Sequence, residues 1–288
     1  MIFIDLYDKI RDMKNKDNKI KRILAVLLLL VILAVSGCSG NESGNSEREV
    51  STTSNVVRIT FPEGSTVSQM ALLLEENGVC SAADFMAQAN EPLNLEGCGF
   101  EIPNPAERAF LLEGYLFPDT YEFYRGESAE SAIGRFLKNS KAKLDGEIVS
   151  RCNELGLSLD EVLTIASIIQ EEAGVPAEMS KVSSVIHNRL NSDDFPRLQC
   201  DAATFYLRKY VEPYVDEAGM EALSERYNTY KCKGLPAGPI TNSGIDAVKA
   251  ALYPEETDYY FFVTDSNGVY YYAETWDEHI KNCDIAGL

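Results

Sequence analysis

The chain has 288 residues, of which 45% are hydrophobic, a proportion typical of a globular protein with one large or two modest domains. It carries 45 acidic and 26 basic residues, which gives a formal net charge of −19 at pH 7. A surface this acidic repels phosphate backbones and anionic lipid headgroups, and this argues against nucleic acid as a partner.

The first 38 residues predict an export signal. A polar segment rich in Lys and Arg extends to residue 22, and thirteen apolar residues follow at 23–35. This run is shorter than the roughly 20 residues of a membrane span but has the length of a signal-peptide core. It ends in Val-Ser-Gly-Cys, similar to a bacterial lipobox, in which the chain is cut before the cysteine and Cys38 receives a lipid. The alternative is an uncleaved signal anchor. Both interpretations anchor the protein in the cell membrane with residues 39–288 outside the cytoplasm.

The cysteines leave two possibilities open. Beyond Cys38 the chain contains six of them: Cys80, Cys98, Cys152, Cys200, Cys232 and Cys283. An even number in an exported chain permits three disulfides, and free thiols in a reducing environment fit equally well. The cysteines lack C-x-x-C spacing and only His187 and His279 accompany them, which argues against a zinc site. The sequence therefore predicts neither a metal nor another cofactor.

Residues 39–55 are rich in Ser, Asn, Glu and Gly, which predicts a disordered tether. Residues 56–110 predict a small module. It contains a strand from Val56, a Pro-Glu-Gly turn, and a helix capped by Thr66 with Gln69 at its third position. A second short helix follows, with Ser81 as its cap. This order resembles LysM-like glycan-binding modules, although it is also common in unrelated domains.

An aromatic segment follows at 113–124, EGYLFPDTYEFY, with a Pro-Asp turn in its middle. Aromatic side chains of this kind usually form an edge strand and turn that pack on a core. The alternative is that they form part of a sugar-binding floor. Helices are predicted for residues 128–143 and 146–155.

The segment 158–174, SLDEVLTIASIIQEEAG, predicts a helix with both ends marked. Ser158 and Glu161 form a capping box, and Gly174 stops the helix. The apolar side chains fill one broad arc; Glu171 lies opposite that arc, whereas Glu172 lies on its flank. A carboxylate held against apolar surface has a raised pKa, which a general acid needs. The alternative is a solvated acidic helix end.

The remaining chain predicts a mixed α+β domain in which helices outnumber strands. A helix is expected at 177–190, with His187 packed beside its buried stripe. Asp201 is expected to cap a helix after the extended segment 198–201, and Ser243 to cap another that ends at Tyr253. Residues 258–263 and 269–273 predict a hairpin around an Asn-Gly turn. A capping box of Thr275 and Glu278 predicts the final helix.

Eight motif blocks together resemble the MltG/YceG-like family of endolytic murein transglycosylases. They are EGYLFPDTYEF, LTIASIIQEEA, KVSSVIHNRL, LQCD, YNTY, GLPAGPI, NSGIDAVKAAL and TDYYFFVTDSNGVYYYAET with its trailing EHIKN. The blocks cover about residues 56–283 in the family's order. The resemblance implies a LysM-like module at 56–110 and a YceG-like catalytic domain at 111–288. It also implies a membrane-anchored enzyme of cell-wall assembly that cuts peptidoglycan strands internally, in partnership with peptidoglycan synthases.

The resemblance also assigns residues. The family's catalytic glutamate falls on Glu172. The matching motifs imply that four residues contact the sugar or orient Glu172, unless they serve only as caps and turn residues: Gln199, Asp201, Asn228 and Tyr230. Three positions depart from the family pattern. Gln170 replaces the first glutamate of the helix motif, so a charge is lost while hydrogen bonding remains possible. Cys200 replaces a Ser or Thr, and Ala202 replaces a common Pro.

The mechanism that the resemblance implies needs one carboxyl group. Protonated Glu172 protonates the oxygen between N-acetylmuramic acid and N-acetylglucosamine, then accepts the proton of the C6 hydroxyl as that hydroxyl attacks C1 and closes a 1,6-anhydro ring. One alternative is a muramidase that hydrolyses the same bond, with Asp201 or Asp119 activating water. The other is a non-catalytic lipoprotein that binds peptidoglycan through its LysM-like module.

Overall fold

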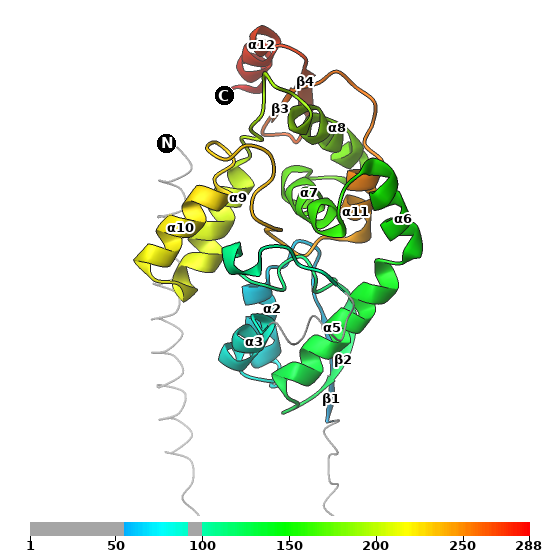
Figure 1. Cartoon of the computed structure of the whole chain (residues 1–288), viewed down its shortest axis with the longest axis vertical. Coiled ribbons are helices and arrows are strands. Elements are labelled where there is room, and N and C mark those ends of the chain that lie inside the picture. Colours follow the sequence, from blue (N-terminus) through cyan, green and yellow to red (C-terminus); the bar gives the residue numbers. More distant parts are fainter. Residues whose placement is uncertain (1–54, 92–99) are drawn as a thin grey trace, which may run out of the picture. The chain divides into compact units, whose positions relative to one another are not determined.

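A computed structural model describes residues 55–91 and 100–288, which lie within one compact unit, Thr53–Leu288 (Figure 1). The predicted signal segment 1–38, the predicted tether up to residue 54, and Cys98 lie outside the described residues. In the part of the chain that is described, no helix is long and apolar enough to cross a membrane. The predicted helix-rich α+β class is confirmed: many helices accompany two small antiparallel sheets.

The first sheet joins the start of the described chain to the aromatic segment. Strand β1 (Val56–Thr60) pairs antiparallel with β2 (Thr120–Tyr124), so that Val56 lies opposite Tyr124. Between the two strands in sequence lie α2 (Val67–Glu76) and α3 (Ala82–Ala89), which pack on each other. Helix α5 (Ala129–Lys143) follows β2 and packs on α3. The caps predicted at Thr66 and Ser81 are both formed. Because β2 lies beyond residue 110, the sheet connects the predicted module with the segment after it, and that module boundary stays a prediction.

The aromatic side chains of 113–124 belong to the core. Tyr115 and Phe123 are fully buried, and Phe117 and Tyr121 are 8% exposed. The ring centroids of Tyr121 and Phe136 in α5 lie 4.5 Å apart. The alternative of a sugar-binding floor is therefore wrong for these four rings, because all of them are buried. Only the fifth aromatic, Tyr124, is exposed.

Helix α7 (Leu159–Glu172) lies at the centre of the helical part and contacts α6 (Gly146–Leu155), α8 (Met179–Leu190), α9 (Asp201–Tyr206) and α11 (Ile245–Leu252) (Figure 1). The predicted capping box is present at its start. Every residue from 162 to 169 is buried, a wider surface than the predicted arc. The hydroxyl groups of Thr164 and Ser167 tolerate this burial because each donates to a carbonyl of the preceding turn, both at 2.8 Å.

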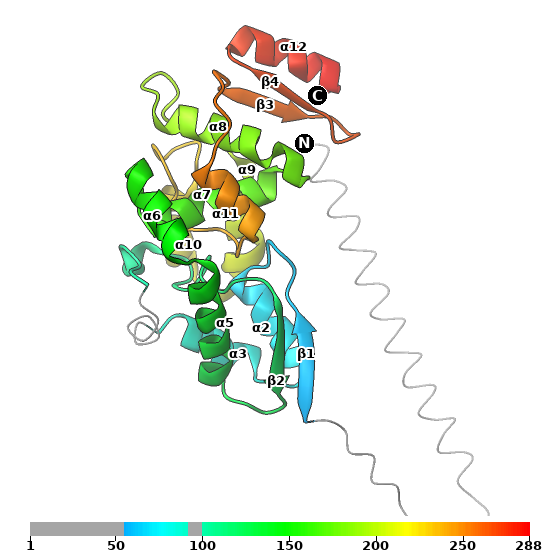
Figure 2. The same cartoon turned by 90° about the vertical axis from the view of Figure 1, so that its right-hand side faces the viewer.

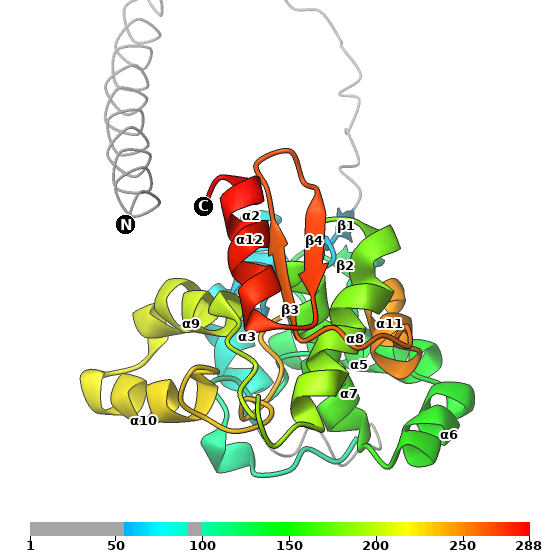
Figure 3. The same ribbon diagram turned by 90° about the horizontal axis from the view of Figure 1, so that it is seen from above.

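The second sheet is the predicted hairpin, formed by β3 (Phe261–Thr264) and β4 (Tyr270–Ala273). Helix α12 (Trp276–Ala286) packs against both strands, and α8 contacts β3 (Figures 2 and 3). The capping box predicted at Thr275 and Glu278 is formed. The remaining elements are α10 (Glu217–Tyr227), the short turns Pro105–Glu107, Pro176–Glu178 and Glu212–Tyr214, and a π-helical turn, Leu207–Val211.

Two predicted caps are wrong by one residue. Helix α11 has Gly244 at its N-cap position, and the hydroxyl of Ser243 is buried without a partner. Helix α9 begins at Asp201 itself, with Cys200 at the N-cap position and no side-chain cap. At α9 the backbone N–H of Ala202 instead donates to the side chain of Glu172, which lies far away in the sequence. The five cysteines in the described ranges are free thiols, so no disulfide joins them.

Candidate active site

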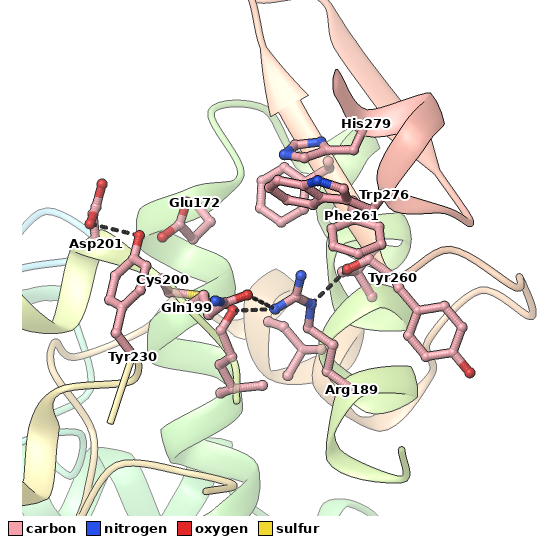
Figure 4. A pocket seen from close by; sticks show the side chains of 14 residues that line it. Glu172, Arg189, Gln199, Cys200, Asp201, Tyr230, Tyr260, Phe261, Trp276 and His279 are labelled. Carbon is pink, nitrogen blue, oxygen red and sulfur yellow. Dashed lines mark hydrogen bonds between the residues drawn. The ribbon is translucent and has the colours of Figure 1, made fainter. Parts of the chain in front are cut away.

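A cavity of about 310 Å³ opens beside the C-terminal end of α7 (Figure 4). Its walls come from α7, α8, the 198–201 segment, Tyr230, strand β3 with the preceding Tyr260, and α12. The lining residues are Glu172, Val185, Ile186, Arg189, Leu198, Gln199, Cys200, Asp201, Tyr230, Tyr260, Phe261, Phe262, Trp276 and His279. Four of the five predicted catalytic and substrate-binding residues are among them, and the fifth, Asn228, does not line the cavity.

Glu172 is the last residue of α7 and is half-buried at the cavity. Burial raises the pKa of Glu172 to about 7, and the negative charges of Asp201 and Glu171 act in the same direction. A hydrogen bond from the backbone N–H of Ala202 favours the ionised form and limits the rise. The carboxyl group can therefore donate and accept a proton near neutral pH.

Asp201 and Tyr230 form the wall next to Glu172. The hydroxyl of Tyr230 donates to Oδ1 of Asp201 at 3.0 Å, and both side chains are exposed. Asn228 Oδ1 accepts from the backbone N–H of Tyr230 at 3.0 Å. Asn228 thus stabilises the turn that carries Tyr230. This is the structural role that the sequence offered as the alternative to a sugar contact.

Gln199 is held by an arginine that the sequence motifs did not single out. Its backbone has φ of 56°, a left-handed conformation that costs energy in a non-glycine residue. Arg189 Nη1 donates to Gln199 Oε1 at 2.8 Å, and Arg189 Nε donates to the carbonyl of Tyr260 at 2.6 Å. Arg189 is only 7% exposed, and its Nη1 also donates to the backbone carbonyls of Arg197 and Leu198. A buried cation therefore fixes the 197–199 segment against β3.

The opposite wall of the cavity is aromatic. The rings of Phe261 and Trp276 lie 5.6 Å apart in an edge-to-face arrangement, and Phe261 stacks with His279 at 5.2 Å. Figure 4 shows these three rings together on one side of the cavity, with Glu172, Asp201 and Tyr230 on the other. The sequence signal for this wall is weak, because an aromatic-rich hairpin and a Trp at the start of a helix usually belong to a core.

Tyr270 on β4 secures the end of α7. Its hydroxyl accepts from the backbone N–H of Gly174 at 2.6 Å and donates to the backbone carbonyl of Glu172 at 3.0 Å. The hairpin therefore holds the turn that carries Glu172, although almost a hundred residues separate them in sequence.

Gln170 lies outside the cavity lining. Its Oε1 accepts from the backbone N–H of Gly244 at 2.9 Å, at the start of α11. The amide thus binds the N–H of the N-cap residue of α11, and the lost charge affects a helix contact. Within the described ranges, no group of three His, Cys, Asp or Glu side chains is arranged to hold a metal ion.

Known proteins match most of the chain. An endolytic murein transglycosylase of Bacillus subtilis (strain 168) is 32% identical over 80% of this chain and 65% of its own length. A protein of the same name from Streptococcus pneumoniae serotype 2 (strain D39) is 28% identical over 78% of this chain and 43% of its own length. The chain thus spans less than two thirds of the length of these two relatives.

A solved structure matches as well. The crystal structure of a YceG-like protein from Listeria monocytogenes has 31% identity and a TM-score of 0.67, covering 78% of this chain and 74% of that chain. The model of the YceG-like family matches residues 43–285. The resemblance drawn from the motif blocks is confirmed: the chain belongs to the YceG-like family.

Proposed function

We propose that the protein is an endolytic peptidoglycan transglycosylase with Glu172 as its catalytic acid and base. The observation that carries the proposal is a half-buried carboxyl group with a pKa of about 7 at a cavity that has room for a sugar. The names of the two relatives, endolytic murein transglycosylase, support the substrate class.

The proposed reaction uses a single carboxyl group. Protonated Glu172 gives its proton to the oxygen that joins C1 of N-acetylmuramic acid to N-acetylglucosamine, and the C1–O bond breaks with positive charge developing at C1. The C6 hydroxyl of the same muramic acid then attacks C1 and loses its proton to the Glu172 carboxylate. The products are a 1,6-anhydro end and a free hydroxyl on the leaving sugar, and the acid is restored. Because the nucleophile is part of the substrate, no water takes part.

The remaining parts of the proposal concern anchoring and binding. Cys38 carries a lipid, or residues 23–35 stay as a signal anchor, so that the folded part acts outside the cytoplasm next to nascent peptidoglycan and its synthases. The module built from β1, α2 and α3 binds glycan in the manner of LysM-like modules. Its two packed helices beside an antiparallel strand pair are the feature that supports this role.

A muramidase is the second candidate, because Asp201 supplies another carboxylate in the same cavity. Two carboxyl groups with a water between them are what an inverting hydrolase uses. Asp119, the other predicted helper, instead pairs with Lys143 at 3.3 Å at the start of β2. A protein that only binds peptidoglycan is the third candidate.

Mass spectrometry of the products distinguishes the three candidate functions. The full-length protein in detergent is incubated with peptidoglycan, and 1,6-anhydro ends, which are one water lighter than reducing ends, are expected. Glu172→Gln should lose about 10²- to 10⁴-fold in rate, whereas Glu147→Gln, on the exposed side of α6, should cleave normally. Reducing ends would identify a muramidase, and binding without soluble products would identify a binding protein. Unchanged cleavage by Glu172→Gln would refute the residue assignment.

A further inference from the structure

The single tryptophan of the chain stands at the rim of the candidate active site. Trp276 is the first residue of α12, is 56% exposed and lines the cavity that also contains Glu172. Single exposed apolar residues are ordinary on a protein surface. Trp276, however, contacts the rings of Phe261 and His279, so these residues form one aromatic wall of the cavity that contains Glu172.

The aromatic wall is rigidly supported. Phe261 is 4% exposed, and the guanidinium of Arg189 lies 4.9 Å from its ring centroid on an anchored side chain. Trp276 starts a helix that has a complete capping box and packs on both strands of the hairpin. A ring held in this way loses little conformational freedom when a ligand binds, which favours affinity.

The chemistry of the aromatic wall suits a sugar ring. A pyranose has apolar C–H faces and a rim of hydroxyl groups, so that one face can lie on a flat aromatic surface while the rim remains available for hydrogen bonds. Burial lowers the pKa of His279, and the nearby Arg189 acts in the same direction, so the imidazole is neutral at pH 7. The three rings therefore present no charge, and a carboxylate or phosphate group has no partner among them.

We propose that Trp276, supported by Phe261 and His279, forms a subsite that stacks one pyranose of a glycan strand, adjacent to the sugar whose glycosidic bond faces Glu172. The proposal rests on the proposed function for its substrate class. It adds a binding determinant on α12, at the side of the cavity opposite Asp201 and Tyr230 (Figure 4).

Tryptophan fluorescence tests the subsite directly, because the chain contains one tryptophan. The full-length Glu172→Gln protein is titrated with soluble oligosaccharides of uncrosslinked peptidoglycan, and binding is followed in parallel by calorimetry. Stacking removes water from the indole, so emission should shift to shorter wavelength with the same dissociation constant that calorimetry gives. Trp276→Ala should weaken binding about fivefold to tenfold, and Trp276→Phe should retain most of the affinity.

Tyr253→Ala is the matched control, because Tyr253 is 52% exposed but lies outside the cavity lining. It should bind with unchanged affinity. Absence of binding, calorimetric binding without an emission change, or full affinity in a folded Trp276→Ala protein would each overturn the subsite. Cleavage by the unmodified protein with an unchanged KM in Trp276→Ala would refute the subsite alone. Stacking without any cleavage by the unmodified protein would refute the proposed function alone.

Discussion

Glu172 owes its raised pKa first to burial and then to the charge of Asp201, while one backbone N–H opposes both. In the proposed reaction the carboxyl group must be protonated at the start. The rate should therefore fall as pH rises above about 7, because the ionised form has no proton to donate.

Asp201→Asn provides the first residue-scale prediction. Removing a negative charge beside Glu172 lowers the pKa of its carboxyl group, so the alkaline fall in rate should begin at lower pH. Initial rates on peptidoglycan between pH 5 and pH 9 measure this shift. Tyr230→Phe is the control, because it deletes the hydroxyl that bonds to Asp201 but keeps the charge. An alkaline fall at the same pH in Asp201→Asn would contradict the electrostatic coupling.

The second residue-scale prediction concerns Tyr270 as a positioning residue. Tyr270→Phe removes one oxygen and with it the hydrogen bonds to Gly174 and Glu172. The turn that carries the proposed catalytic carboxyl group should then move, which we expect to lower kcat about 10- to 100-fold with little change in KM. Stability should fall by only about 1 kcal/mol.

Steady-state kinetics and thermal unfolding separate these effects. Tyr271→Phe, which deletes the neighbouring hydroxyl that contacts Asp265 at 3.4 Å, should leave kcat unchanged. If Tyr270→Phe lowered stability and left kcat unchanged, the hydroxyl would have only a structural role.

At the scale of elements, the features that the sequence predicts well are local ones. The capping boxes at Ser158 and Thr275 and the Asn-Gly hairpin each depend on residues within a few positions of one another, and all are present. Ser243 was a reasonable cap by the same logic. The N-cap position is instead Gly244, whose N–H donates to Gln170, over seventy residues away.

Long-range contacts explain what the sequence does not predict. The pairing of β1 with β2 joins residues about 60 positions apart, and no local pattern reports it. The same holds for the aromatic wall and for Arg189, because their place at the cavity depends on how β3 packs against α8 and how α12 packs against the hairpin. The position of Glu172 at the cavity was predictable because the family motif and the helix periodicity coincide at this residue. For the other predicted site residues, which come from distant segments, the family motif was the only signal.

A buried ion pair yields the element-scale prediction. Asp160, in the first turn of α7, accepts from Arg108 Nη2 and from the hydroxyl of Tyr115 at 2.7 Å, and all three side chains are buried. Arg108→Met would leave Asp160 buried without its cation. We expect the free energy of unfolding, measured by urea denaturation, to fall by about 3–5 kcal/mol.

Glu154→Gln is the matched control for the ion pair. Glu154 pairs with Arg151 at 2.8 Å on the exposed side of α6. Losing that pair should cost only about 0–1 kcal/mol, because water screens exposed charges. Equal losses in the two variants would show that the burial of Asp160 has no energetic consequence.

At the scale of the whole molecule, Glu113 connects the first module to the helical part. Its carboxyl group, 1% exposed, accepts from the backbone N–H of Val67 at 3.0 Å, from Asn242 Nδ2 at 2.9 Å and from the hydroxyl of Tyr206 at 3.1 Å. These partners belong to α2, to the loop before α11 and to α9. The hydrophobic core is likewise one cluster that extends from Ile59 to Leu252.

This junction should make the stability of the whole protein depend on pH. Burial raises the pKa of Glu113 from its usual value near 4.5 to about 8, despite three hydrogen bonds that favour the ionised form. Between these pH values the folded protein keeps a proton that the unfolded chain has lost. The folded state therefore loses stability as pH rises through this window, by about 1.4 kcal/mol for each unit that separates the two pKa values. Glu172, with a pKa of about 7, adds to the slope in the lower part of the window.

Glu113→Gln separates this contribution from the general repulsion of an acidic chain. Because glutamine does not titrate, the variant should lose less stability between pH 5 and pH 8 than the unmodified protein, and its advantage should be constant above that range. Urea denaturation at several pH values measures both slopes. Glu122→Gln, which makes the same charge change on the exposed face of β2, should keep the original slope. Parallel slopes for Glu113→Gln and the unmodified protein would mean that Glu113 keeps the same charge in the folded and unfolded chains, so that the hydrogen bonds from Val67, Asn242 and Tyr206 offset its burial.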